Sequence, residues 1–251
     1  MDDEGTPFHL TGHKILITGA SSGIGRASAV AASRMGAQLW ISGRDAARLD
    51  ETLHMLEGGN HTALTADLTD EADRAKLVDA LPPLDGVVHS AGICKLRPSA
   101  FVTTTDFRET TTINIEAPIL LTSLLVKKKR LNSGSSVVFL SSVSGLVGWT
   151  GLMSYAASKA ALPGAARVFA VELARRRIRV NCISPGTVWT PMVKQLDDQL
   201  TVEARKEDEK RYLLGYGEPQ DVANAVTFLL CPASRWITGT NMVVDGGYLA
   251  V

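Results

Sequence analysis

The sequence has no excess charge of either sign and no long apolar run. Its 251 residues include 26 Lys and Arg against 26 Asp and Glu, so the formal net charge is zero. A balanced charge gives no electrostatic reason to expect nucleic acid or an anionic membrane as a partner. No stretch approaches the roughly 18 apolar residues of a transmembrane helix. We therefore expect neither nucleic acid nor a membrane among its partners.

Cysteine is scarce, and the few cysteines are far apart. Cys94, Cys182 and Cys231 form no CxxC pair and no metal-ligand spacing, so we expect no bound metal. Isolated thiols are typical of a reducing compartment rather than of a disulfide-linked secreted fold. The segment MDDEGTPF at 1–8 is acidic and lacks the apolar stretch of a signal peptide. These features predict a cytoplasmic protein.

The sequence is rich in short β-branched runs that alternate with longer helical patterns, and 45% of its residues are hydrophobic. The runs near 87–88 and 137–140 are apolar on consecutive residues, so both faces of these strands should be covered. This order predicts an α/β fold: a doubly wound, Rossmann-like parallel sheet of about seven strands with helices on both faces. Because repeats and linkers are absent, we expect one domain over 1–251. Strands are expected at 14–18, 38–42, 61–66, 84–89, 135–141, 178–184 and 241–245, and helices at about 24–35, 45–57, 70–80, 105–131, 153–177 and 219–230.

The segment 187–215 is charged and weakly periodic, and it follows Pro185-Gly186. We predict a flexible helical flap over a cleft there. Its Trp189 and Met192, together with Trp149, favour a partly apolar substrate pocket, although such side chains can also serve only to pack the flap.

A glycine-rich turn, TGASSGIG at 18–25, follows the first expected strand and opens the first expected helix. Glycines let backbone N–H groups approach a phosphate, and a helix N-terminus favours negative charge. Gly25 would let the helix pack close to the strand. Glycine turns are common, but this placement predicts a dinucleotide site.

The second expected strand ends in Ser42-Gly43-Arg44, beside which the adenosine ribose of a cofactor should lie. An acidic side chain there would bind the ribose 2′-hydroxyl of NAD, and this sequence has none. Gly43 leaves room, Ser42 can donate a hydrogen bond, and Arg44 can pair with a 2′-phosphate. We therefore expect NADP rather than NAD. The alternative is that Arg44 is an ordinary solvated residue ahead of a helix.

The stretch SYAASKAAL at 154–162 places Tyr155 and Lys159 one turn apart on one helical face. A free phenol has a pKa of about 10, and a nearby cation would lower that pKa toward neutrality. Tyr155 could then exchange a proton with a carbonyl or hydroxyl oxygen. The alanines around the pair would let the helix press against a cofactor or another helix. An isolated pair of this kind is more often an ordinary surface contact.

Two further features favour chemistry at this pair. Ser142 follows the fifth expected strand at its carboxyl end, where clefts form in open α/β sheets, although a serine in a serine-rich turn is commonplace. In NIEAP, Pro118 removes the hydrogen bond to the carbonyl of Asn114, which predicts a kink and a free carbonyl that could hold a water.

Together these motifs resemble the short-chain dehydrogenase/reductase family in its compact single-domain form, over about residues 10–250. The resemblance implies a catalytic set of Asn114, Ser142, Tyr155 and Lys159. In that set Tyr155 is the acid/base, Ser142 polarises the substrate oxygen, Lys159 holds the nicotinamide ribose and lowers the tyrosine pKa, and Asn114 anchors a relay water. The cofactor contacts implied are Gly19, Ser21, Ser22, Gly23, Ile24, Gly25, Ser42, Gly43, Arg44, Asp67, Leu68, Ser90, Ala91, Gly92, Tyr155, Lys159, Pro185, Gly186, Val188 and Thr190.

One departure from the family pattern stands at 89–92, where HSAG replaces the usual NNAG. His89 lacks the amide that is thought to brace the central sheet in similar proteins. We expect a structural histidine whose ring nitrogens are hydrogen-bonded, rather than a titrating functional group.

The resemblance implies an NADP-dependent reductase or dehydrogenase acting on a small carbonyl or alcohol. A 3-oxoacyl-carrier-protein reductase is one candidate, because KKKR at 127–130 and RRRIR at 175–179 could dock an acidic carrier. Cations at helix C-termini are also favoured by the helix dipole alone. The alternatives are an NAD-dependent sugar, polyol or hydroxysteroid dehydrogenase and a non-catalytic dinucleotide sensor. An epimerase or dehydratase is disfavoured by the length of the chain and its glycine spacing. The resemblance also implies a homotetramer.

Overall fold

The computed structural model describes residues 6–197 and 201–251. These residues form a seven-stranded sheet in the order β3-β2-β1-β4-β5-β6-β7. Every neighbouring pair runs parallel, which confirms the doubly wound sheet expected from the sequence. The strands are β1 (Lys14–Thr18), β2 (Gln38–Gly43), β3 (Thr62–Thr65), β4 (Leu84–His89), β5 (Leu131–Leu140), β6 (Arg179–Pro185) and β7 (Asn241–Val244).

Both faces of the sheet are buried because successive strand residues enter opposite cores. In β1, Leu16 belongs to one hydrophobic cluster, whereas Ile15 and Ile17 belong to the other. In β5, Phe139 and Val138 divide in the same way. A side-chain period of two therefore turns a continuous apolar run into two cores, which explains why these strands do not alternate with polar residues.

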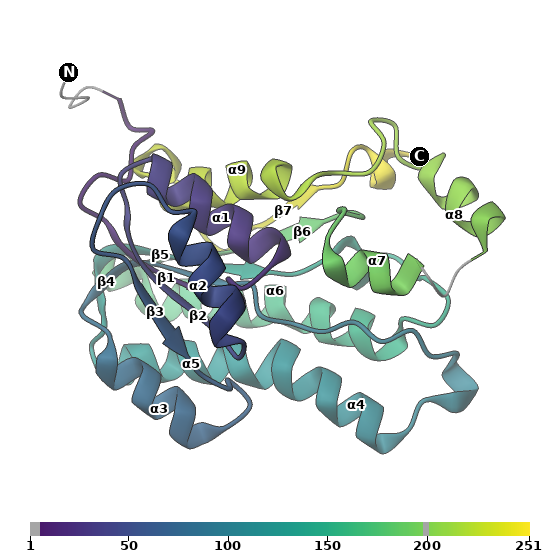
Figure 1. Ribbon diagram of the computed structural model, residues 1–251, viewed down its shortest axis with the longest axis horizontal. Coiled ribbons are helices and arrows are strands. Elements are labelled where there is room, and N and C mark those ends of the chain that lie inside the picture. Colours follow the sequence, from purple (N-terminus) through teal and green to yellow (C-terminus); the bar gives the residue numbers. More distant parts are fainter. Residues whose placement is uncertain (1–5, 198–200) are drawn as a thin grey trace.

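The helices cover the two faces of this sheet. Helices α1, α2 and α9 contribute to one cluster and α3, α5 and α6 to the other. Figure 1 shows α1 and α9 along the upper side and α3 and α5 along the lower side. The α-helices are α1 (Gly23–Arg34), α2 (Ala46–His54), α3 (Glu71–Ala80), α4 (Thr104–Thr111), α5 (Ala117–Lys127), α6 (Met153–Leu173), α7 (Pro191–Asp197), α8 (Val202–Glu209) and α9 (Pro219–Leu230).

The fifth strand begins earlier than the sequence pattern predicts. The expected start at 135 is wrong, because the strand already pairs with Leu84 of β4 through Leu131. The next pair is Gly86 with Ser136, so residues 132–135 face Asp85 alone. This irregularity falls on the polar stretch NSGS, in which Gly134 has a φ of +84°. A bulge of polar residues hid the start of the strand.

The single helix expected over 105–131 is also wrong in detail. The structure divides it into α4, a π-helical turn (Thr112–Glu116) and α5. Pro118 lies at the start of α5, so the chain accommodates the missing N–H by widening the preceding turn. The expected kink is therefore a π-helical turn centred on Asn114. The helix expected at 153–177 ends as an α-helix at Leu173 and continues as a short 3₁₀ turn.

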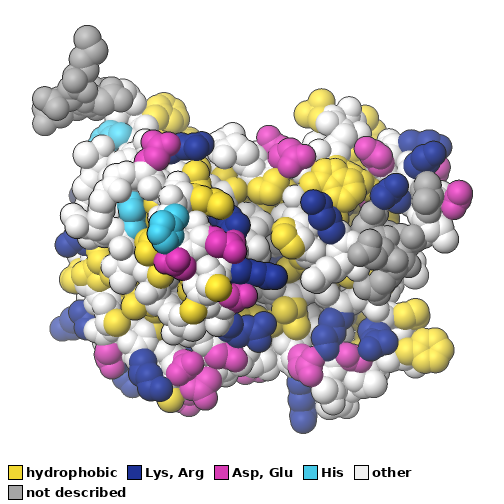
Figure 2. Space-filling view, in the orientation of Figure 1, with side chains coloured by type: hydrophobic (Ala, Val, Ile, Leu, Met, Phe, Trp, Pro, Cys, Tyr) yellow, Lys and Arg dark blue, Asp and Glu magenta, His cyan; other side chains and the backbone are white. Residues whose placement is uncertain are grey.

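The predicted flap contains two helices, α7 and α8; in Figure 1, α8 lies at the right-hand end and α7 lies lower and nearer the centre. Residues 198–200 of the predicted flap lie outside the described residues. None of the helices in the described ranges combines the length and apolar character that crossing a membrane requires. Figure 2 shows acidic and basic side chains interspersed on the visible face, in keeping with the zero net charge.

Candidate active site

A groove of about 440 Å³ opens at the carboxyl ends of the strands. It lies where β1 pairs with both β2 and β4, the point at which the strand order reverses. Such a crevice is the usual binding position in open α/β sheets. Most of the predicted contacts line it: Gly19, Ser21, Ser22, Gly23, Ile24, Gly43, Arg44, Leu68, Ser90, Ala91, Gly92, Ser142, Tyr155, Lys159, Pro185, Gly186, Val188 and Thr190.

The N-terminus of α1 faces this groove without a cap from the described part of the chain. Ser22 at the N-cap makes no side-chain capping bond, and the first turn contains no acidic residue. By contrast, Asp45 caps α2 and Asp70 caps α3. The first N–H groups of α1 and the positive end of its dipole therefore suit a bound pyrophosphate.

Two glycines make this turn tight enough to form the floor of the groove. Gly19 has a φ of +65°, and a Cβ there would lie 2.6 Å from the backbone nitrogen of Ala91. A Cβ on Gly25 would lie 2.3 Å from the carbonyl oxygen of Gly19. Gly25 is not among the residues that line the groove, so its contact with a cofactor stays a prediction. Its close packing against the turn is confirmed.

The adenosine end of the groove is formed by Gly43, Arg44 and Arg48. Two other predicted contacts do not line it. Ser42 is fully buried within β2, because its side chain alternates away from the groove while Gly43 faces it. Asp67 instead accepts hydrogen bonds from the backbone and hydroxyl of Thr69, which, with the nearby Arg44, lower the pKa of its carboxyl.

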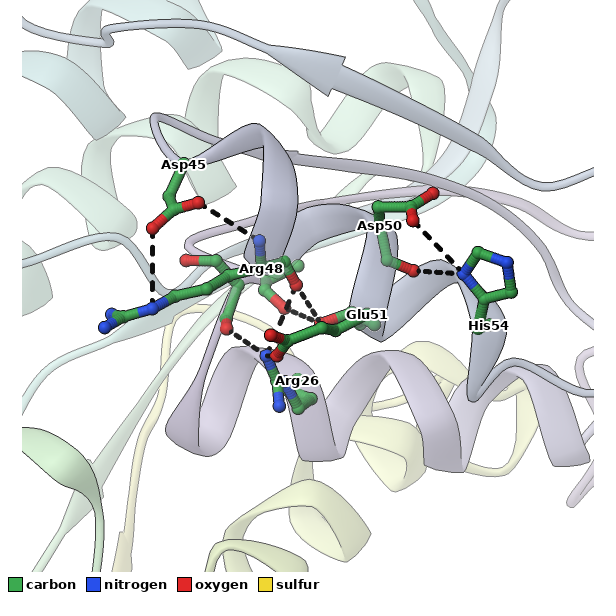
Figure 3. Close-up of polar contacts among 9 residues, drawn as sticks. Arg26, Asp45, Arg48, Asp50, Glu51 and His54 are labelled. Carbon is green, nitrogen blue, oxygen red and sulfur yellow. Dashed lines mark hydrogen bonds and ion pairs between the residues drawn. The ribbon is translucent and has the colours of Figure 1, made fainter.

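Arg48 was not predicted, and the signal was its position four residues after Arg44. Figure 3 shows its side chain extended toward Asp45, with Nε 3.4 Å from Oδ2. On the other side, Arg26 joins α1 to α2 by a 2.9 Å ion pair with Glu51. Arg26 also donates a 2.6 Å hydrogen bond to the carbonyl of Ser21 in the glycine-rich turn. It likewise donates to the carbonyl of Arg48, so this network fixes the glycine-rich turn relative to the helix that carries Arg48.

Ser142, Tyr155 and Lys159 come together as the sequence predicted. The Nζ atom of Lys159 lies 5.6 Å from the ring centroid of Tyr155 and donates a 2.8 Å hydrogen bond to the carbonyl of Leu140. The Oγ atom of Ser142 accepts a 3.1 Å hydrogen bond from the N–H of Ser144. Its own proton is thus available to another oxygen.

The electrostatics of this set differ from the expectation. Burial raises the pKa of Tyr155, Cys94 raises it further, and a hydrogen bond with Ser142 acts in the opposite direction. Burial also lowers the pKa of Lys159 to about 8. The expected net lowering of the tyrosine pKa is therefore wrong for this structure, because burial of the phenol has the largest effect and raises that pKa.

Asn114 is not among the residues that line the groove. Its side chain is buried at 1% exposure. The amide oxygen accepts a 2.9 Å hydrogen bond from the N–H of Ile93. The amide nitrogen donates to the carbonyl of Ile93 at 2.9 Å and to the hydroxyl of Ser158 at 3.0 Å. Ser158 in turn donates to the carbonyl of Tyr155 at 2.7 Å. The π-helical turn is thereby tied to the loop after β4 and to the helix of the tyrosine.

The small residues around Tyr155 allow a close backbone approach. A Cβ on Gly145 would lie 2.8 Å from the backbone nitrogen of Ala160. The loop that carries Ser142 therefore packs directly on α6. Ser141 secures this contact by donating a 2.7 Å hydrogen bond to the carbonyl of Lys159.

A second cavity, of about 150 Å³, adjoins the groove and is predominantly apolar. Its walls include Trp149, Trp189 and Met192, as the sequence predicted. They also include Tyr212, within the predicted flap, and Tyr216 and Tyr248 beyond it, and sequence reasoning missed all three. The residues common to both cavities are Cys94, Ser142, Tyr155, Gly186, Met192 and Val193. The two hydroxyls of the set thus lie where the cavities meet.

His89 is buried and packs against the core rather than facing the groove. Its ring stacks on Phe139 at 4.8 Å, and burial lowers its pKa to about 3. The Nε2 atom lies 2.8 Å from the hydroxyl of Thr122, which donates to the carbonyl of Pro118. Nε2 must therefore carry the proton, and Nδ1 has no partner among the described residues. The structural interpretation holds, but only one nitrogen is hydrogen-bonded.

The two basic segments do not border the groove within one protomer. Residues 127–130 lead into the amino end of β5, and residues 175–179 lead into that of β6. The groove lies at the carboxyl ends of these strands, and β5 alone spans ten residues, about 33 Å at the usual rise per residue. Their positive charge therefore gives no support to carrier docking beside the groove of the same chain.

The fold and the groove define a dinucleotide-binding protein with an oxidoreductase-type side-chain set. The chain belongs to the short-chain dehydrogenase/reductase family: a family model described as enoyl-(acyl carrier protein) reductase matches residues 19–249. A 3-oxoacyl-[acyl-carrier-protein] reductase of Rickettsia bellii is 35% identical over 242 residues, which are 96% of this chain and 99% of that protein. A glucose 1-dehydrogenase of Gluconobacter oxydans is 34% identical over 95% of this chain and 92% of that protein.

Solved structures agree with this assignment. A putative 2-deoxy-D-gluconate 3-dehydrogenase from Agrobacterium tumefaciens, solved with bound NADP, has a TM-score of 0.88 and 32% identity. The match covers 98% of this chain and 100% of that one. The chain is therefore an oxidoreductase of this family by sequence and by fold.

Proposed function

We propose that the chain is an NADP(H)-dependent oxidoreductase that interconverts a ketone and a secondary alcohol. The observation that carries this proposal is the position of Ser142 and Tyr155, which line both the groove and the adjoining apolar cavity. A substrate oxygen at this junction could contact both hydroxyls while its carbon faces the groove. That arrangement suits hydride transfer coupled to proton transfer.

Each residue has a role that follows from its contacts. Ser142 accepts from Ser144 and can donate its own proton to the substrate oxygen. Tyr155 gives a proton to that oxygen in reduction and takes one in oxidation. Lys159, buried beside the phenol ring, stabilises the phenolate formed in reduction. When bound, NADPH would supply the hydride to the carbonyl carbon.

Asn114 acts as a positioning residue in this proposal. Its amide holds Ile93 and Ser158, and Ser158 holds the backbone of Tyr155. In this proposal the backbone carbonyl of Asn114 holds the relay water.

The groove favours NADP over NAD. The uncapped N-terminus of α1 suits the pyrophosphate, and Arg44 and Arg48 lie at the end where a 2′-phosphate would bind. A relative solved with NADP supports this choice. We would titrate the protein with NADPH and NADH by calorimetry. Equal or tighter binding of NADH would contradict the proposal and favour an NAD-dependent sugar, polyol or hydroxysteroid dehydrogenase.

A turnover assay with a panel of ketones tests the reaction once NADPH binding is established. Reduction by the wild type that is lost in Tyr155→Phe supports the proposal. Binding without turnover of any ketone or alcohol would contradict it and favour a dinucleotide-sensing protein.

A 3-oxoacyl-carrier-protein reductase is the second candidate, favoured by the 35% identity to a relative of that name. The basic segments at 127–130 and 175–179 do not add support for this candidate, because they lie away from the groove of the same protomer. Reduction of a carrier-linked 3-oxoacyl thioester at least tenfold more efficiently than free ketones would support this candidate.

We also propose a homotetramer. Val168 and Val171 on α6 and Leu120 on α5 are 57%, 78% and 45% exposed, an unusual position for branched apolar side chains. Burial against copies of the same helices would remove them from water. Sedimentation as a monomer at micromolar concentration would contradict this assembly.

The three cysteines are free thiols, which supports our proposal of a cytoplasmic location. Fractionation of the producing cell tests it. Recovery in the membrane or the culture medium would contradict the proposal.

A further inference from the structure

The apolar cavity contains a buried carboxylate that the proposed reaction does not use. Asp208, near the C-terminus of α8, lines the cavity and is 8% exposed. Its Oδ2 atom accepts a 2.9 Å hydrogen bond from the hydroxyl of Tyr216. Its Oδ1 atom is buried and has no hydrogen-bond partner among the described residues. A buried carboxylate oxygen without a partner is unfavourable unless a ligand supplies one.

No described residue that lines this cavity offsets the charge of Asp208. The lining contains no Arg, and Lys159 lines only the adjoining groove. Arg211 acts electrostatically on Asp208 from outside the cavity lining. It is an exposed residue whose guanidinium lies 4.4 Å from the ring centroid of Tyr248 and 6.0 Å from that of Trp149. Arg211 lowers the pKa of Asp208, but burial has the larger effect and raises it.

Two aromatic rings, those of Trp189 and Tyr216, line the same cavity as the carboxylate. Trp189 and Tyr216 meet edge to face, with centroids 5.3 Å apart and an interplanar angle of 80°. Tyr216 is the residue that bonds Asp208. Arg211 stacks on Tyr248 and Trp149 instead. A carboxylate beside two aromatic rings is a favourable environment for an organic ammonium group.

We propose that Asp208 selects a substrate that carries a protonated amine on a compact, otherwise apolar skeleton. This inference rests on the proposed function, since it assigns the substrate class of the same cavity. The reacting oxygen would lie at Ser142 and Tyr155, and the ammonium would donate to Oδ1 of Asp208 beside Trp189. A cavity of about 150 Å³ suits a single ring better than a long chain, and a substrate carboxylate would meet Asp208 with like charge.

The test measures binding rather than turnover, so it remains decisive if the proposed reaction fails. Cyclohexylammonium, cyclohexanol and cyclohexanecarboxylate share one ring and differ in a single group. The full-length protein would be titrated with each at neutral pH, with the fluorescence of Trp189 and Trp149 as the readout. We expect the ammonium to bind at least about tenfold more tightly than the alcohol, and the carboxylate to bind most weakly.

Two variants distinguish the effect of the Asp208 carboxylate from that of general surface charge. Asp208→Asn keeps the shape and should abolish the preference for the ammonium while leaving the affinity for cyclohexanol within about twofold. Glu209→Gln removes the same charge from an exposed neighbour on α8 and should change nothing. Melting curves of both variants establish that they are folded. If Asp208→Asn does not fold, the ranking of the three probes on the wild type decides.

Several results would overturn the proposal. These are tightest binding of the carboxylate, equal binding of the ammonium and the alcohol, no binding of the ammonium, and an ammonium preference that survives in folded Asp208→Asn. Loss of the preference in Glu209→Gln would also overturn it, because general surface charge would then be the cause. If the protein also turns over alcohols, trans-4-aminocyclohexanol should be oxidised more efficiently than trans-4-methylcyclohexanol by the wild type and not by Asp208→Asn.

Discussion

The ammonium of Lys159 lies 5.6 Å from the ring centre of Tyr155, yet its hydrogen bond goes to the carbonyl of Leu140. The lysine is therefore held beside the phenol by the end of β5 rather than by the phenol itself. Both groups are buried, and burial raises the pKa of Tyr155 and lowers the pKa of Lys159. Burial thus favours the neutral form of each group. This relationship leads to the first two predictions.

Replacement of Tyr155 by Phe should abolish turnover with little effect on cofactor binding. The ring and its packing remain, while the proton donor is lost. General acid–base catalysis usually contributes a factor of about 100 to 10,000, so we expect kcat to fall by at least about 100-fold. Steady-state kinetics and an NADPH titration check this. Full activity in the variant would remove Tyr155 from the proposed chemistry.

The buried Lys159 should make the protein more stable as the pH rises above neutrality. Its pKa is about 8 in the folded state and about 10.4 in an unfolded chain, so the unfolded state binds more protons between these values. Stability from this group therefore increases with pH. Relative to Lys159→Met, the wild type should gain about 2 kcal/mol of unfolding free energy between about pH 7.5 and 9.5. Urea unfolding of both proteins measures this difference, and a constant difference would contradict the prediction.

Arg44→Ser should weaken NADPH binding by at least about tenfold while leaving NADH binding within about twofold, because only NADPH carries the 2′-phosphate. The matched control is Arg34→Ser, which removes a positive charge from the far end of α1, where Arg34 pairs with Glu57. Isothermal calorimetry at two salt concentrations measures both affinities. Equal losses for the two cofactors would show that Arg44 acts on something other than the phosphate.

We expect the buried His89 to lower the unfolding free energy of the protein as the pH falls. Its pKa is about 3 in the folded protein against about 6.5 in an unfolded chain, so the unfolded state takes up a proton first as the pH falls. Stability from this group is present above about pH 6.5 and is lost as the pH falls toward 3. Between about pH 7 and 4.5 the wild type should lose about 2 to 3 kcal/mol relative to His89→Asn. Denaturant unfolding at several pH values checks this, and parallel curves would contradict it.

Several parts of the fold could be predicted because the signal is local. The apolar runs of β1 and β4 gave strands whose bounds agree with the structure. The glycine-rich turn was assigned correctly because positive φ and a helix start leave a recognisable pattern at Gly19 and Gly23. The start of β5 was missed because a polar bulge interrupts its pattern.

The sequence by itself determined the order of strands and helices along the chain and the spacing of Ser142, Tyr155 and Lys159, because hydrophobic period and helical geometry act over a few residues. Only the tertiary structure decided which polar groups reach the groove. Ser42 is fully buried in β2 and the carboxylate of Asp67 is bonded to Thr69, whereas Arg48 lines the groove. Tertiary structure also brought Asp208 to a cavity shared with Tyr155. Such burial and alignment depend on packing between distant segments, and no local pattern encodes that packing.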